Sequence, residues 1–276
     1  MGKENKCSLF DFEGASDVAN NLIDKLASGI GWIANRNTPK KIAADTYIEE
    51  IKKMNCSPEL KAALISQTDK IIKEYCNQND IVHIAINGLN EDTNPKNVED
   101  DWIALFMDQA RLISDSVFQE IWGRILAQEC NVNNSIPKTL LHTLAQMDKE
   151  DAQAFTALCS ITVKINEEYE PIIVAGKLRE YERWGITFDS LINLGALGLV
   201  KSDLGPLAPG YIIESDKTTI KITYFDLEYE VEKNNKELRI GNVMFTKSGQ
   251  ALCKAISVEK KEDFWEYYCL PFWKEN

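Results

Sequence analysis

The chain has 276 residues, of which 44% are apolar and 27% are charged. These proportions are ordinary for a globular protein and exclude wholesale disorder. Lys and Arg number 31 against 43 Asp and Glu, so the formal net charge is −12. An acidic chain repels the phosphate backbone at long range, which argues against nucleic acid as a partner.

Seven cysteines are scattered through the chain without a C-x-x-C pair, which favours reduced thiols in the cytosol over a disulfide framework. The two histidines, His83 and His142, have no neighbour at zinc-ligand spacing. The first residues lack the apolar stretch of a signal peptide, and Lys6 stands where a myristoylation signal has Ser or Thr. No run approaches the length of a membrane span. We therefore expect a cytoplasmic protein with no metal and no cofactor.

Residues 1–87 are predicted to form an N-terminal helical region. Ser16 is expected to cap a helix over residues 18–34. The apolar residues of this helix recur at three- and four-residue steps on one face, namely Val18, Leu22, Leu26, Ile30 and Ile33.

Two further helices are predicted before the first boundary. One covers residues 42–54, and the next begins after Ser57 as N-cap, with Pro58 at its first position, where no N–H is needed. The polar run GLNEDTNPKNVE at residues 88–99 then predicts a connector and a domain boundary.

Residues 98–160 carry the strongest helical pattern and are predicted to be a compact helical unit. A helix over 100–113 places Trp102, Phe106, Ala110 and Ile113 on one stripe. Ser114 and Asp115 interrupt the pattern and are expected to cap the next helix. That helix, at 116–129, should direct Val117, Ile121, Trp122 and Ile125 inward.

Two more helix starts complete this unit. Ser135 is expected to cap a helix with Pro137 in its first turn, and this helix should bury Leu140, Leu141 and Leu144. Asp148 is expected to cap the following helix, with Asp151 three residues later completing a capping box.

Residues 161–276 are predicted to be an α+β domain that ends in an aromatic segment. A short helix over 188–198 should lead into a strand, and residues 218–232 alternate as a half-buried strand does. Residues 237–246 are expected to return as a second strand of a hairpin, and Thr246 to cap a helix. The last aromatic residues are expected to pack onto this same domain; they are Phe264, Trp265, Tyr267, Tyr268, Phe272 and Trp273.

The order helix, strand, hairpin, helix resembles the winged-helix family, as do the segments L-x-x-L-x-x-L-G-L-V and F-T-x-x-G-x-x-L. The resemblance implies a winged-helix-like architecture. Residues 160–276 carry 15 basic and 19 acidic side chains, a net of −4, which argues against DNA binding. The expected fold is therefore mainly α with a small β-hairpin: N-terminal helices, a compact helical unit and a C-terminal winged-helix-like domain.

No phosphate loop, dinucleotide fingerprint, zincin motif or hydrolase elbow is present, so the sequence predicts no catalytic residue. Glu129, Cys159 and His142 are interpreted as structural residues. A reactive thiolate needs a cation or a helix N-terminus nearby, and Cys159 has neither in sequence. Trp32, together with the glycines before it, leaves open a membrane-surface segment at residues 18–34.

The run D-W-I-A-L-F-M-D-Q-A-R-L-I-S-D-S-V-F-Q-E-I-W-G-R-I-L-A-Q-E, from Asp101 onward, resembles the core of an uncharacterised bacterial family, DUF2806. The matching positions are Trp102, Phe106, Ser114, Asp115, Gln119, Trp122 and Glu129. The pattern T-L-x-x-x-L-x-x-M-D-K-x-D-A at 139–152 also fits, and the resemblance covers residues 98–256. After Glu129 the chain reads NVNNSIP where the family has Pro-Gly-Ser-Phe-Ser.

The resemblance implies a bacterial cytosolic protein without an assigned catalytic residue. Similar helical units occur in proteins linked to phage defence, so we expect a non-enzymatic interaction, sensor or effector component of anti-phage defence. Its partner is expected to be a protein encoded nearby, and residues 16–80 are expected to form a homo-oligomer. The alternatives are a membrane-active abortive-infection effector that uses the segment around Trp32, and a DNA-binding regulator that uses the winged-helix-like domain.

Overall fold

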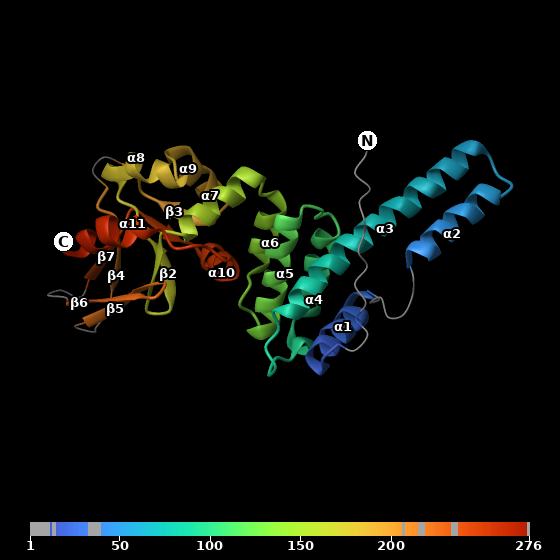
Figure 1. Ribbon diagram of the computed structural model, residues 1–276, viewed down its shortest axis with the longest axis horizontal. Coiled ribbons are helices and arrows are strands. Elements are labelled where there is room, and N and C mark those ends of the chain that lie inside the picture. The colour runs from blue at the N-terminus through green and yellow to red at the C-terminus, as the bar shows by residue number, and fades with distance from the viewer. Residues whose placement is uncertain are drawn as a thin grey trace. The chain divides into compact units, whose positions relative to one another are not determined.

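A computed structural model describes residue 12 and residues 15–32, 40–205, 208–214, 219–232 and 237–274, with the side chains of 40–45, 232 and 274 left aside. The chain forms two compact units, Met1–Leu141 and His142–Asn276. The described part is mainly helical, as predicted, with small antiparallel sheets confined to the second unit (Figure 1). These sheets hold more strands than the single hairpin that the sequence predicts.

The first unit is all helical. Its elements are α1 (Asp17–Ile30), α2 (Lys40–Lys53), α3 (Pro58–Asn87), the 3-10 turn η1 (Pro95–Asn97), α4 (Asp100–Ala110), α5 (Ser116–Asn131) and the first residues of α6 (Lys138–Gln146). The predicted caps at Ser16, Ser57 and Asp115 are confirmed, since each side chain accepts a hydrogen bond from a first-turn N–H. Ser114 is exposed and is not the N-cap; Asp115 alone is.

The apolar face of α1 is buried within this unit. Leu22, Ile23 and Leu26 are buried, and Trp32 stacks on Tyr75 of α3 with ring centroids 5.9 Å apart. Of the predicted stripe, Val18 and Ile30 are half-buried, and Ile33 lies outside the described residues. The contacts of α1 therefore run mainly to its own unit.

Helices α3 and α5 pack closely where α5 carries a glycine. A Cβ added at Gly123 would lie 2.5 Å from Cγ2 of Ile84 and 3.0 Å from the carbonyl oxygen of Ile81, both on α3. Because no side chain other than hydrogen fits there, the glycine sets the distance between the two helices.

Two predicted orientations in this unit are wrong. Val117 was expected to point inward, but it lies in the first turn of α5 and is 57% exposed. Ser135 was expected to cap α6, whereas its hydroxyl donates to the Gln128 carbonyl at the end of α5. The Leu residues expected to be buried by α6, namely Leu140, Leu141 and Leu144, are buried.

The second unit combines helices with three small antiparallel sheets. It contains α7 (Lys149–Cys159), β1 (Thr162–Ile165), β2 (Glu168–Pro171), η2 (Ala175–Lys177), α8 (Leu178–Tyr181), η3 (Glu182–Trp184), α9 (Phe188–Ala196), β3 (Val200–Ser202), β4 (Tyr211–Glu214), β5 (Thr219–Tyr224), β6 (Leu227–Glu232), β7 (Glu237–Gly241), β8 (Val243–Phe245), α10 (Lys247–Ala255), α11 (Glu262–Phe264), the π-helical turn η4 (Trp265–Cys269) and α12 (Leu270–Lys274). The sheet orders are β2-β1-β5-β6, β3-β8 and β4-β7. The predicted capping box of Asp148 and Asp151 and the predicted cap Thr246 are confirmed.

The predicted hairpin is wrong in its pairing. Residues 218–232, expected to be one strand, contain β5 and β6, which pair with each other about a turn at Phe225 and Asp226. The expected return strand is divided between β7 and β8, which pair with β4 and β3.

The C-terminal aromatic segment packs onto its own unit, as predicted. Tyr224 of β5 contacts the rings of Phe264 and Trp265, with centroids 5.1 and 5.8 Å away. Trp273 donates from Nε1 to the Arg239 carbonyl at 2.8 Å. Tyr267, by contrast, is 67% exposed.

Five described cysteines have free thiols: Cys56, Cys130, Cys159, Cys253 and Cys269. Cys76, on α3, is disulfide-bonded, contrary to the expectation of reduced thiols throughout.

Residues 88–99, the predicted connector, are tied to α5 because the Asn131 side chain donates to the Gly88 carbonyl and accepts from the Asn90 N–H. The division into compact units falls in α6.

Candidate functional site

Three aromatic side chains of the sequence motif form one buried cluster. Phe106 contacts Trp102 in a stacked geometry and Trp122 in a tilted one, with both centroid distances at 5.2 Å. Trp102 is 3% exposed, and the other two rings are fully buried. Such a cluster supplies hydrophobic stabilisation and leaves no face open to a ligand.

Glu129 holds the loop between α5 and α6. Its carboxylate accepts from the N–H groups of Asn134 at 2.7 Å and Ile136 at 2.8 Å, and the Trp102 indole donates to the Ile136 carbonyl at 3.0 Å. Burial raises the pKa of Glu129, and the hydrogen bonds from the loop oppose that rise. Asn134 has a left-handed backbone with φ of 62°, so the carboxylate fixes an irregular turn.

The turn between α4 and α5 is held by two more motif residues. Oδ1 of Asp115 accepts from the N–H groups of Val117 and Phe118 at 2.9 and 3.3 Å. The Gln119 amide donates to the Ile113 carbonyl at 3.0 Å. Both side chains therefore bond to the backbone of their own unit.

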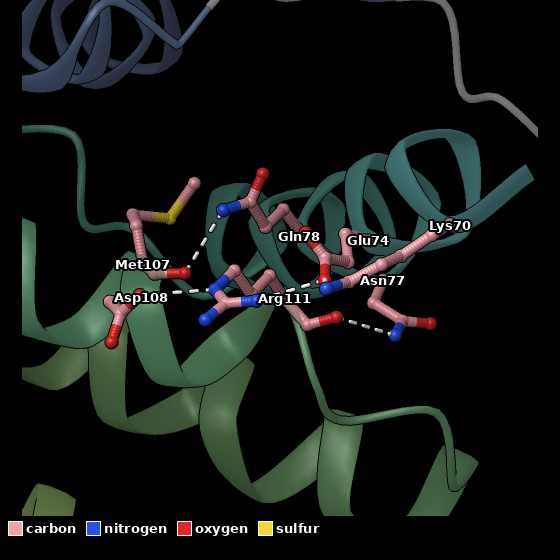
Figure 2. Close-up of polar contacts among 7 residues, drawn as sticks. All are labelled: Lys70, Glu74, Asn77, Gln78, Met107, Asp108 and Arg111. Atoms are coloured by element: carbon pink, nitrogen blue, oxygen red, sulfur yellow. Dashed lines mark hydrogen bonds and ion pairs between the residues drawn. The ribbon is translucent and has the colours of Figure 1, made fainter. Parts of the chain in front are cut away.

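A second polar cluster, which the sequence interpretation missed, joins α3 to the end of α4 (Figure 2). Arg111 binds Glu74 at 2.8 Å and Asp108 at 3.0 Å. Asn77 donates to the Arg111 carbonyl at 2.8 Å, and Gln78 to the Met107 carbonyl at 2.9 Å. These bonds satisfy carbonyls at the C-terminal end of α4, which is a stabilising role. The only sequence signal was the Asp108–Arg111 spacing on one helix.

Buried carboxyl groups are spread over separate elements. Burial raises the pKa of Asp80 on α3 to about 6 and that of Glu170 on β2 to about 7. His83 has a lowered pKa, also because of burial. In the part of the chain that the structure describes, no three His, Cys, Asp or Glu side chains are grouped so that they could hold a metal ion.

The outer face of α9 is apolar and exposed. Phe188 is 51% exposed and Ile192 is 48% exposed, while Leu191 and Leu194 are buried beneath them. The helix sequence FDSLINLGA contains Asp189 and no Lys or Arg. Phe188 and Ile192 are four residues apart, so they lie on the same face of the helix.

Helix α2 and the first half of α3 form a helical hairpin, which we call the arm (Figure 1). The arm carries a second set of exposed apolar side chains. Along α3, no described residue before Cys76 is buried. Among the described side chains of the arm, the large exposed apolar ones are Tyr47, Met54, Leu60 and Ile71.

Among the described residues, no helix is both long enough and apolar enough to cross a membrane. The apolar face of α1 is buried, and Trp32 packs against Tyr75 of α3.

The motif residues of this mainly helical chain build a core, and exposed apolar side chains occur on α9 and on the arm, among other places. The family is shown by its sequence. Residues 66–269 match the family described as "Protein of unknown function (DUF2806)", and the chain belongs to that family. Neither the curated proteins nor the solved structures include a match.

Proposed function

We propose that this protein is a non-enzymatic interaction component that binds another protein through the outer face of α9. The observation that carries the proposal is the exposure of Phe188 and Ile192 on a helix without basic residues. Large apolar side chains at a solvent-facing position cost solubility and are typical of protein interfaces.

We also propose that the second unit is winged-helix-like. Helix α8 and the turn η3 lead through Gly185, which has a left-handed φ of 83°, into α9, and β3 and β8 then pair antiparallel. Helix, glycine-containing turn, helix and a two-stranded wing is the order of that architecture. Here the connection between β3 and β8 is expanded by β4 to β7, and the β1–β2 hairpin precedes α8.

In a DNA-binding winged helix, the second helix of the pair enters the major groove, and basic or amide side chains contact the bases and phosphates. The equivalent helix in this chain is α9, which presents Phe188, Asp189 and Ile192 instead. Nearby Arg183 is paired with Asp263 at 3.1 Å and lies over the Trp184 ring. The charge on this face therefore favours a protein partner over DNA.

The test uses the full-length tagged protein purified from its own host. A co-purifying protein should be retained by the wild type and lost from Phe188→Glu/Ile192→Glu. The matched control is Ile212→Glu, because Ile212 is a 45% exposed apolar residue of β4 in the same unit. The proposal is contradicted if the wild type, the double variant and the Ile212→Glu control all retain the co-purifying protein. It is also contradicted if the wild type binds duplex DNA at low salt and the double variant does not.

We further propose that the arm joins two copies of the chain. Of the predicted interface at residues 16–80, the α1 part is buried in its own unit, and the arm is the part left exposed. Residues 40–75 contain seven basic and six acidic side chains, so the arm is nearly neutral in a chain of net charge −12. Two arms therefore repel each other less than the acidic remainder of two chains does. Two such hairpins can pair into a four-helix bundle.

Light scattering at tens of micromolar tests the arm. The wild type should exceed its monomer mass of 31.3 kDa, and Leu60→Glu/Ile71→Glu should return to that mass. Leu112→Glu is the control, because Leu112 is 58% exposed but lies outside the arm. A wild-type monomer, or a dimer unaffected by the double variant, would show that the arm is not the interface.

For the biological setting we propose the cytoplasm of a bacterium, in a defence system against phage whose partner gene lies nearby. The support is the likeness of the helical motif to units in defence proteins, together with surfaces suited to assembly rather than a reaction centre. Plaque counts with and without the gene and its neighbours test the setting. The Phe188→Glu/Ile192→Glu variant should lose protection against phage. Unchanged plaque counts after deletion of the gene would exclude a role in phage defence.

A further inference from the structure

The second unit contains a cavity of about 340 Å³ that is lined by two cysteines. The cavity lies among the end of α7, strands β1 and β5, and helix α10 and the residues that follow it. Cys159 and Cys253 face it together with Thr162, Lys164, Tyr169 and Thr223.

The two thiols belong together despite their distance in sequence. Cys159 is the last residue of α7, and Cys253 lies in α10. Both are free thiols, they are 3% and 8% exposed, and they lie within hydrogen-bonding distance of each other. The other buried free cysteines of the described residues, Cys130 and Cys269, do not line this cavity.

The surroundings give the two thiols different parts in an oxidation. Burial, and next the neighbouring Cys253, raise the pKa of Cys159, so that thiol stays protonated near neutral pH. No histidine lines the cavity to serve as a base. Two adjacent sulfurs beside an opening can instead be joined in a disulfide, because the second thiol traps the first once it is oxidised.

We propose that Cys159 and Cys253 form an oxidation site for a small hydroperoxide that enters this cavity. Cys253, the more exposed thiol, attacks hydrogen peroxide; the O–O bond breaks, and sulfenic acid and one water form. The Cys159 sulfur then attacks the Cys253 sulfur, the S–O bond breaks, and the hydroxyl leaves as a second water with the Cys159 proton. In total, two thiols and one peroxide give one disulfide and two waters.

The disulfide would tie the last residue of α7 to α10. Gln250 of α10 already exchanges hydrogen bonds with the Tyr169 backbone at 2.9 and 2.6 Å, so α10 is fastened to β2. A disulfide at Cys253 would attach α10 to α7 as well. This inference stands independently of the proposed partner binding, because it rests only on the cavity and the thiol pair.

Peptide mapping of the full-length protein tests the site. The protein is treated with hydrogen peroxide, alkylated and digested without reductant, and mass spectrometry searches for the Cys159–Cys253 crosslink. We expect this crosslink to appear and the melting temperature to rise by several degrees, because a link between distant residues restricts the unfolded chain. Loss of the crosslink after addition of a thiol reductant should reverse the shift.

Matched variants separate this pair from the other buried cysteines. Cys253→Ser should abolish the crosslink and the thermal shift, whereas Cys130→Ser and Cys269→Ser should retain both. In Cys159→Ser, a sulfenic-acid trapping reagent should label Cys253. The proposal is overturned if wild-type peroxide treatment oxidises the half-exposed Cys56 and leaves Cys159 and Cys253 as alkylated thiols.

Discussion

Helices α5 and α9 both carry apolar residues in helical register, yet the fold uses them in opposite ways. α5 buries even its polar Gln119 and Glu129, and α3 packs along it. α9 buries only Leu191 and Leu194, against α7 and β3, and leaves Phe188 and Ile192 exposed. The family motif therefore marks a core, whereas α9 leaves two large apolar side chains exposed, which is why we propose it as the binding surface.

The largest effect should come from Trp122→Ala in α5. Its indole is fully buried and contacts Phe106, so the truncation should lower the free energy of unfolding by about 3–5 kcal/mol. Urea denaturation measures this loss. An unchanged unfolding midpoint would mean that α5 is not the core element described.

Glu129→Ala should cost about 2–3 kcal/mol, because it leaves the N–H groups of Asn134 and Ile136 without their acceptor. The raised pKa of Glu129 also predicts a pH effect. The folded state binds the Glu129 proton more tightly than the unfolded state does. The stability gained from protonation of Glu129 is therefore complete below the pKa of the unfolded state, and it is lost as pH rises through the raised pKa of the folded state. Glu129→Gln should lose that pH dependence in denaturation curves, and retention of it would assign the effect to another group.

The same substitution should have opposite signs in the two helices. Gly123→Ala places a methyl group against Ile84 and should destabilise by about 1–2 kcal/mol, although alanine is the better helix former. At Gly195 in α9 the nearest atom to an added Cβ is 3.9 Å away, so Gly195→Ala should stabilise by about 0.5–1 kcal/mol. Thermal melts of both variants measure the two changes in stability. If both melting temperatures rise, or both fall, the contrast between α5 and α9 is wrong.

The smallest effect on stability should come from Phe188→Glu/Ile192→Glu, within about 0.5 kcal/mol of wild type. Exposed side chains have few contacts to lose, so chemical denaturation should give the same midpoint. A loss of several kcal/mol would place these residues in an internal interface instead.

Local signals predicted much of the helical structure. Asp115, Asp148 and Thr246 sit at helix starts because their side chains accept first-turn N–H bonds, which sequence spacing reveals. The orientation of Val117 was missed because the periodic pattern begins in the first turn of α5, before the buried residues of that helix start. Ser135 was missed because a carbonyl at the end of α5 competes for its hydroxyl.

The sheets were harder to predict because pairing is non-local. The alternation in β5 and β6 is visible, but the turn between them uses Phe225 at a φ of 52° and contains no Gly or Asn to signal it. Partners for β7 and β8 come from β4 and β3, which precede them by many residues. The polar contacts of Arg111 with Glu74 likewise join two helices whose packing the sequence does not specify.

Amide hydrogen exchange on the full-length protein, alone and with its co-purified partner, tests whether α9 is the binding surface and α5 the core. We expect slower exchange over Phe188–Ala196 in the complex and unchanged, already slow exchange over Ser116–Asn131. Protection that appears in α5 while α9 exchanges at its free rate would contradict it.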